Sequence, residues 1–298
     1  MYTSDFSEFL KPAEIDAIFE QTRRKSVVQQ LARQVTMGQH GTNIPVWTGK
    51  PTAGFVDEGA VKPTSEVSAT VKKMVPHKIA VIVPVSAELV RANPLGVIQH
   101  AQADMVEALA VAFDNAVLHG VNSPYANDLS DVTQTAEMDT NGAGAYASFN
   151  GILRTLVTNG KKLTGFALDS VVEPDLNIAV DGTGKSIFVE SATDVNDVVR
   201  QGRLLGRPTF LSDNLKNAAG TIVGFAGDWS QIIWGQVAAI QVDVTDQATI
   251  ELSGAGGTLN LWQRNMLALR AEVEYGVLIN DLNSFVKIQA NDPATPAA

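Results

Sequence analysis

Residues 93–120 read NPLGVIQHAQADMVEALAVAFDNAVLHG, and this stretch predicts one long amphipathic helix. Asn93 is a good N-cap, Pro94 suits the first helical position, and Gly120 is typical of a residue just past a helix end. At ~1.5 Å per residue the helix would be roughly 39 Å long. One apolar stripe follows the helical spacing: Ile98, Ala101, Met105, Leu109, Ala112 and Ala116. We therefore expect a structural spine beside a twisted sheet, in an α+β fold.

The sequence ahead of this helix predicts a long two-stranded hairpin. Gly and Pro residues interrupt residues 38–82, and short β-prone pieces lie on either side of residues 55–59, which form its expected tip. An isolated hairpin is marginally stable in water, so this one is expected to pack against another surface, as an arm does in an assembly. An apolar strand over residues 78–85 then leads to Ser86, the expected N-cap of a short helix.

The first 40 residues predict two helical starts. Pro12 fits the first position of an amphipathic helix, and Ser26 with Gln29 has the spacing of a capping box. Arg23, Arg24 and Lys25 lie between them. The basic run suits a solvated helix end, or a patch that touches an acidic partner surface or nucleic acid.

The middle of the chain predicts a second α+β unit, after a polar segment at residues 121–150 that should be loop. Asp169 is the expected cap of a helix that runs towards residue 180. Two late β-prone pieces, residues 260–274 and 284–289, could pair with strands of the first unit, which would leave one domain inserted in the other. The other expected elements are a helix at residues 152–157 and strands at 166–168, 187–190, 209–211 and 221–226.

Composition excludes several classes of protein. Hydrophobic residues make up 45% of the 298 residues and charged residues 18%, so the chain is not wholly disordered. The 22 Lys and Arg residues stand against 32 Asp and Glu, a net charge of −10 that argues against a dedicated nucleic-acid binder. No cysteine is present, which excludes thiolate catalysis and Cys-based metal sites. The first ten residues do not resemble a secretory leader, and no apolar run is long enough for a membrane helix, so we expect no membrane partner.

One motif suggests an enzyme. Residues 179–186 read AVDGTGKS, which satisfies a relaxed phosphate-binding-loop pattern ending at Lys185 and Ser186. A working loop needs a buried strand before it and a helix directly after it. Here an expected helix precedes the motif and an expected strand follows it, so a simple turn is the better interpretation.

Other candidate chemistry lacks partners. The four histidines, His40, His77, His100 and His119, show no ligand spacing, and no Gly-x-Ser-x-Gly elbow occurs. Acidic neighbours such as Glu272 and Glu274 suit a solvated face. The aromatic residues Phe225, Trp229, Trp234 and Trp262 suit a core. We expect no enzyme, no catalytic residue, no cofactor and no metal.

The ordered features together resemble the major capsid proteins of tailed bacteriophages with the Hong Kong 97-type fold. The similarity covers nearly the whole chain. It runs through these segments: residues 43–46, 53–59, 62–65, 76–80, 85–89, 114–120, 204–208, 211–213, 226–229, 265–270 and 285–288.

This resemblance implies a division of the chain. The implied parts are an N-terminal arm (1–40), an extended E-loop hairpin (41–78), a peripheral P-domain with the spine helix (79–120 and 243–290), an inserted axial A-domain (121–242) and a flexible tail (291–298). Candidates for contacts between subunits are Lys50, Asp57, Glu58, Lys62, Arg23 and Arg24.

The resemblance also implies a function. Subunits would form hexamers and pentamers that close an icosahedral shell around double-stranded DNA, without sequence-specific contact, in a virion assembled in the host cytoplasm. Because the arm starts almost at Met1, any scaffolding protein is expected to be separate, and portal and decoration proteins are further expected partners. The alternatives are an encapsulin-like nanocompartment shell, which shares the fold, and a P-loop nucleotide hydrolase.

Overall fold

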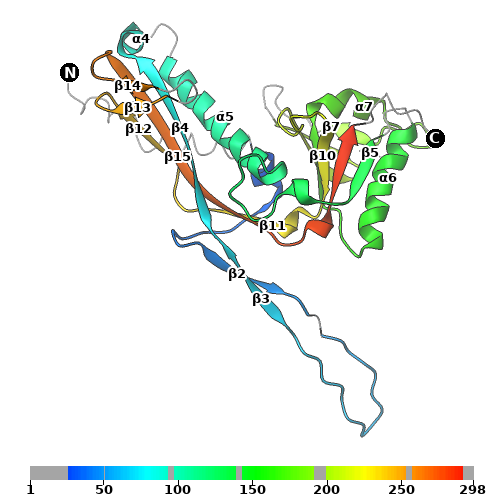
Figure 1. Ribbon diagram of the computed structural model, residues 1–298. Coiled ribbons are helices and arrows are strands. Elements are labelled where there is room, and N and C mark those ends of the chain that lie inside the picture. Colours follow the sequence, from blue (N-terminus) through cyan, green and yellow to red (C-terminus); the bar gives the residue numbers. More distant parts are fainter. Residues whose placement is uncertain are drawn as a thin grey trace.

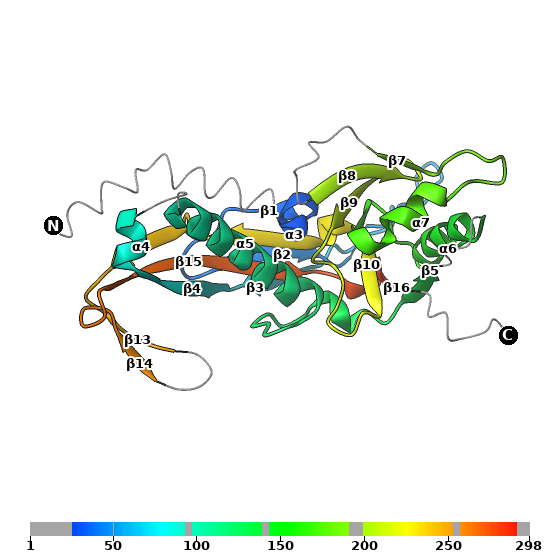
Figure 2. The same ribbon diagram turned by 90° about the horizontal axis from the view of Figure 1, so that it is seen from above.

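The computed structural model describes residues 26–49, 51–92, 97–138, 143–190, 199–252 and 257–290. Figure 1 shows two units, each built on a sheet, and a long hairpin that projects away from both. Figure 2, seen from above, shows the two units side by side along the length of the molecule. Helix α4 lies at the outer end of the first unit, and helix α6 lies at the opposite end of the molecule.

The first unit is a five-stranded sheet with helix α5 (Val97–Leu118) packed along one face. Its longest strand, β15 (Met266–Ile279), pairs antiparallel with β4 (Pro76–Ser86) along one edge. Along its other edge β15 pairs with two strands in succession. The remaining strands are β1 (Arg33–Gln34), β11 (Ile232–Gln236) and β12 (Gln241–Thr245).

Aromatic rings join α5 to this sheet. Phe113 of α5 is fully buried, and its ring centroid lies 4.8 Å from that of Tyr275 on β15 and 6.4 Å from that of Trp234 on β11. Leu109 and Met105 continue the same buried face, one and two turns before Phe113 respectively. Burial of three large rings at one crossing fixes the helix on the sheet.

The second unit is a seven-stranded sheet in the order β5-β16-β10-β6-β9-β8-β7, with helices α6 (Ala143–Thr158) and α7 (Glu173–Ile178). Every residue of the central strand β6 is buried, as expected of a strand covered on both faces. The strands are β5 (Thr135–Met138), β6 (Gly165–Asp169), β7 (Phe188–Glu190), β8 (Val199–Leu204), β9 (Arg207–Ser212), β10 (Ile222–Gly227) and β16 (Phe285–Ala290).

The two units share apolar packing where they meet. Trp229 packs edge-to-face on Phe285 at 5.6 Å between ring centroids, and its indole N–H donates to the carbonyl of Gly165 at 3.1 Å. Both rings belong to the same buried cluster as Phe113. The units are therefore joined by core residues as well as by connecting chain.

The hairpin is formed by β2 (Thr42–Trp47) and β3 (Ala69–Met74). Only Val75 separates β3 from β4, so the hairpin continues the line of the first sheet (Figure 1). At its base, Ile44 and Met74 pack with Met37. Beyond β2 and β3, residues 51–68 are exposed and form no strand.

The remaining elements are short. They are α3 (Val27–Leu31), α4 (Ala87–Ala92), β13 (Thr249–Glu251), β14 (Thr258–Asn260) and the 3₁₀ turns η1 (Leu129–Asp131), η2 (Ser170–Val172), η3 (Trp229–Gln231) and η4 (Leu282–Ser284). In the part of the chain that the structure describes, no helix has the length and apolarity to cross a membrane.

Most of the expected elements are present, with three corrections. Residues 284–289 do not pair with the first unit, because β16 lies between β5 and β10 of the second sheet. Residues 121–150 are not all loop: β5 lies within them, and α6 begins at Ala143, where buried Ala145 and Phe149 extend the apolar face of Ile152. In α5 the buried face contains Phe113, whereas Ala112 is exposed. The expected helix at Pro12 and the cap at Asn93 lie outside the described residues.

Replacing Phe113 with alanine should lower the free energy of unfolding of the unassembled subunit by about 3–5 kcal/mol, because it removes the ring at the crossing of α5 and the sheet. Urea unfolding measures this change. The exposed neighbour Ala108 provides the control, and Ala108→Ser should shift stability by no more than about 0.5 kcal/mol. A loss below about 1 kcal/mol for Phe113→Ala would show that the crossing contributes little.

Candidate assembly surfaces

The charged candidates described on the hairpin all lie in its exposed loop. Asp57, Glu58 and Lys62 belong to residues 51–68, where every side chain is exposed. A turn closes there, with the N–H of Ala60 donating to the carbonyl of Asp57 at 3.1 Å. Within the described ranges no ion pair joins these three side chains to the body of the protein. They are available to a partner. Lys50, Arg23 and Arg24 lie outside the described residues.

The start of the described chain is held by a buried carboxylate on α5. Asp114 accepts a hydrogen bond from the Ser26 hydroxyl at 2.6 Å, and further bonds from the backbone N–H groups of Val27 at 3.0 Å and Val28 at 3.4 Å. These N–H groups open helix α3, where no earlier helical carbonyl can serve them. The Ser26 hydroxyl in turn accepts from the N–H of Gln29, as the sequence predicts for an N-cap.

This anchor has an electrostatic cost. Burial raises the pKa of Asp114 from 3.8 to about 6, and the bonds from Ser26, Val27 and Val28 offset that rise only in part. Asp114 is not among the functional residues expected from the sequence. The available signal was a single acidic residue next to Phe113, on the apolar side of the helix.

The raised pKa sets the pH dependence of stability. Between the unfolded value of 3.8 and the folded value of about 6, the folded chain holds more protons on Asp114. Its contribution to the free energy of unfolding is therefore fully present below pH 3.8 and is lost as the pH rises through 6. At ~1.4 kcal/mol per pKa unit, the loss is on the order of 3 kcal/mol.

Asp114→Asn should abolish this component. Urea unfolding from pH 4 to pH 7 should show the stability of wild type falling relative to that of the variant, because only wild type titrates at this position. Taking the difference between the two proteins cancels the other ionisable groups. Parallel stability profiles across this range would contradict the assigned role.

The phosphate-loop-like motif is a turn. Val180 and Ser186 form an antiparallel bridge, and the carboxylate of Asp181 accepts from the backbone N–H groups of Thr183 at 2.8 Å and Lys185 at 2.9 Å. Hydrogen bonds, foremost from the Thr183 hydroxyl, lower the pKa of Asp181 and keep it ionised. The N–H groups that would bind phosphate in a P-loop therefore donate to the carboxylate of Asp181 instead. Helix α7 precedes the turn and β7 follows it, the reverse of a P-loop.

Lys185→Ala should therefore change neither particle formation nor nucleotide binding. Titration of the purified protein with a fluorescent ATP analogue should give no saturable signal for wild type or variant. ATP hydrolysis by wild type that disappears in the variant would overturn the turn interpretation.

The described histidines occupy packed or exposed positions. His77 packs edge-on against Tyr125 at 5.6 Å, and His119 contacts the carbonyl of Leu215 at 3.0 Å, with burial lowering its pKa. His40 is exposed, and the side chain of His100 lies outside the described set. Among the described residues no group of three His, Asp or Glu side chains could hold a metal.

The acids on β15 belong to a surface ion-pair network. Lys78 lies 3.3 Å from Glu272 and 3.8 Å from Glu274, and Arg270 lies 2.5 Å from Asp243. Exposed pairs of this kind contribute little to stability.

The expected aromatic core is correct for three residues and wrong for the fourth. Phe225, Trp229 and Trp234 are buried, whereas Trp262 is 71% exposed. Trp262 occupies the turn between β14 and β15, and its neighbour Leu261 takes the buried position.

Comparisons with known proteins find similarity to capsid proteins of phages. Residues 9–290 match the phage capsid family. The chain is 40% identical to the "Probable major capsid protein gp17" of Mycobacterium phage L5, over 99% of this chain and 93% of that protein. A protein of the same description from Mycobacterium phage D29 is 40% identical over 95% of this chain and 90% of its own length.

Solved structures share the fold. A chain from Mycobacterium phage Adephagia superposes with a TM-score of 0.70 at 22% identity, covering 92% of each chain. The "Capsid of empty GTA particle computed with C5 symmetry" has a TM-score of 0.60 at 13% identity, covering 90% of each chain.

Proposed function

This chain belongs to the phage capsid family, and we propose that it builds an icosahedral shell of hexamers and pentamers around double-stranded DNA. The chain is a structural major capsid protein of a tailed phage, not an enzyme, and it self-assembles into the virion shell. The encapsulin-like and P-loop alternatives are not favoured, since the relatives at 40% identity are major capsid proteins.

The exposure of the hairpin is the observation that supports the proposal most strongly. Residues 51–68 have no contact with the body to hold them, and Figure 1 shows the hairpin reaching far beyond both sheets. Ordering a residue costs ~1–2 kcal/mol, which the few local contacts of this loop cannot offset. A neighbouring subunit supplies the missing contacts in a shell. Many weak contacts repeated around a closed assembly give a strong collective preference for assembly.

We assign four parts within the described chain. The hairpin is the E-loop, and the residues before it belong to the N-terminal arm. The five-stranded sheet with α5 is the peripheral P-domain, and the seven-stranded sheet is the axial A-domain. Because β16 pairs within the seven-stranded sheet, we assign it to the A-domain. Asp57, Glu58 and Lys62, together with Lys50, Arg23 and Arg24, are the proposed subunit contacts.

The proposed partners follow from charge and family. A net charge of −10 keeps the shell from adhering to packaged DNA. The proposed contact with DNA is not sequence-specific. A separate scaffolding protein, a portal and decoration proteins complete the proposed set, with assembly in the host cytoplasm.

Removing the hairpin loop tests the proposal. Replacing residues 49–65 with a short Gly-Ser turn should leave the circular dichroism of the subunit nearly unchanged, because no core residue is removed. This variant should form no normal shells in sucrose-gradient sedimentation. The control Ser65→Ala removes only the hydrogen bond that the Thr52 N–H donates to the Ser65 hydroxyl at 2.9 Å, and it should still assemble. A loop-replaced chain that gives particles of wild-type size and heat resistance would show that the hairpin is dispensable.

A further inference from the structure

Two neighbouring strands of the first sheet present bare backbone at the same point. Gly235 of β11 and Gly276 of β15 lie directly opposite each other in the antiparallel ladder. Cross-strand partners share one face of a sheet, so the two glycines leave adjacent positions of that face without side chains. A glycine inside a strand weakens the sheet, and it often marks a place where another part of the chain approaches closely.

The bare backbone lies on the face of the sheet opposite helix α5. Trp234 precedes Gly235 and Tyr275 precedes Gly276, and the rings of both aromatic residues contact Phe113 of α5. Because side chains alternate between the two faces along a strand, the glycines belong to the other face. The root of the hairpin, where β3 ends, packs on that second face.

Two buried methionines from the hairpin root cover the bare backbone. Met74 is the last residue of β3, and Met37 lies five residues before β2. A Cβ added to Gly276 would lie 2.6 Å from Sδ of Met37 and 3.1 Å from Cγ of Met74. A Cβ added to Gly235 would lie 3.0 Å from Cβ of Met37 and 3.0 Å from Cε of Met74. An unbranched thioether side chain fills an irregular space of this kind well. We call Met37, Met74, Gly235 and Gly276 the methionine socket.

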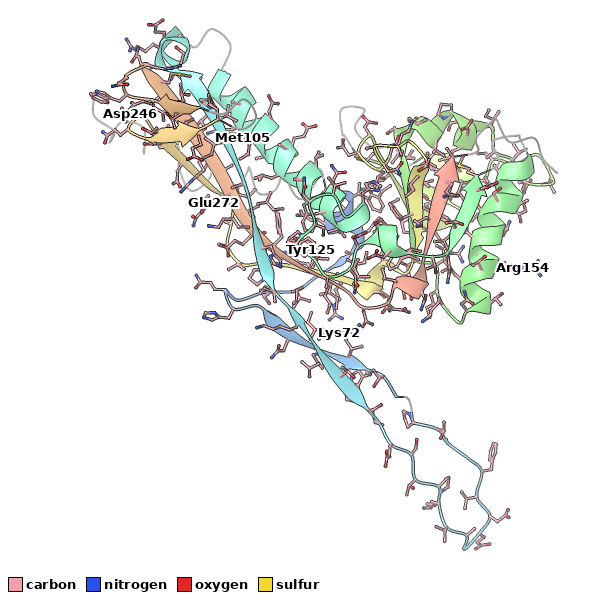
Figure 3. All side chains as sticks on the ribbon, viewed as in Figure 1. Lys72, Met105, Tyr125, Arg154, Asp246 and Glu272 are labelled. Atoms are coloured by element: carbon pink, nitrogen blue, oxygen red, sulfur yellow. The ribbon has the colours of Figure 1, made fainter. Side chains whose placement is uncertain are left out.

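A second attachment lies two residues earlier on β3. Lys72 donates from Nζ to the carbonyl of Asn280 at 2.7 Å, directly after β15 ends. Figure 3 shows Lys72 near the root of the hairpin. Lys72 and Met74 are two residues apart in a strand, so their side chains project from the same face of the hairpin. The two attachments are about 7 Å apart along the strand. Two separate attachments fix a direction, whereas one alone would leave the hairpin free to swing.

We propose that the methionine socket and Lys72 are positioning residues for assembly, which set the angle at which the hairpin leaves the first sheet. Beyond the paired strands, residues 51–68 are exposed and form no strand, so the angle is decided at the root. Copies that meet head to tail close into a ring only at one rotation, and a different rotation gives an open chain. This inference rests on the proposed function, and it names the residues that determine the direction of the hairpin.

Pulsed electron paramagnetic resonance tests the inference on the unassembled chain, which has no native cysteine. Spin labels are attached at Thr70→Cys on β3 and Ala108→Cys on α5, two exposed positions outside the socket. The perturbing variant adds Gly276→Ala to this labelled chain. Its new methyl group meets side-chain atoms of Met37 and Met74 rather than backbone, so the sheet should keep its pairing while the hairpin root moves.

The labelled chain with the native socket should give one narrow distribution of distances between the labels. Gly276→Ala should shift the mean of that distribution or broaden it. The matched control is Gly202→Ala on β8 of the second unit, where the added methyl group would meet the ring of Phe188, and it should leave the distribution unchanged. An unchanged distribution with Gly276→Ala, or the same change in both variants, would overturn the inference.

A second variant keeps the test decisive if Gly276→Ala does not fold. Lys72→Met preserves the length of the side chain but cannot donate to the carbonyl of Asn280, so it should broaden the same distribution. A distribution as narrow as that of the native socket would contradict the assigned role of Lys72.

Particle formation is scored separately by negative-stain electron microscopy. Gly276→Ala should lose closed particles that Gly202→Ala still forms at the same subunit concentration. Equal yields of closed particles from the two variants would overturn the inference while the capsid function stood. Failure of the wild-type chain to form particles would instead contradict the proposed function.

Discussion

Helix α5 packs against β15 and β11, and this packing determines where the other strands and the hairpin lie. Phe113 meets Tyr275 and Trp234 at this crossing, three large rings contributed by distant parts of the chain. With β15 held in place, β4 and β12 pair along its two edges. The hairpin extends from β4, so its direction is set by the same core.

Next to this crossing, Asp114 connects the core to the start of the described chain. Its carboxylate is buried, and the bonds it accepts from residues 26–28 compensate only part of that burial. A hydrophobic residue at this position would pack at lower cost, but it could not satisfy the opening N–H groups of α3. Lys72 gives the hairpin a comparable anchor by donating to the carbonyl of Asn280 at 2.7 Å, where the two units join. Polar contacts thus fix both the start of the described chain and the base of the hairpin to the body.

The sequence predicted the individual helices, strands and turns better than it predicted which elements pack or pair with one another. The spine helix, the hairpin and the turn at residues 181–185 follow from local signals: helical periodicity, Gly and Pro spacing, and Asp-Gly chemistry. The position of β16 could not be predicted, because an apolar strand suits either sheet and only tertiary packing decides between them. Asp114 was missed for a related reason, since its role depends on residues 26–28, far away in sequence. Trp262 shows the converse, because composition alone could not tell an exposed turn from the core.

We propose that the exposed hairpin of this subunit gains its missing contacts only in an assembly. Negative-stain electron microscopy of the expressed chain shows directly whether it assembles. We expect closed particles of uniform diameter. A preparation that contains only single subunits, stable in sedimentation at high concentration, would contradict it.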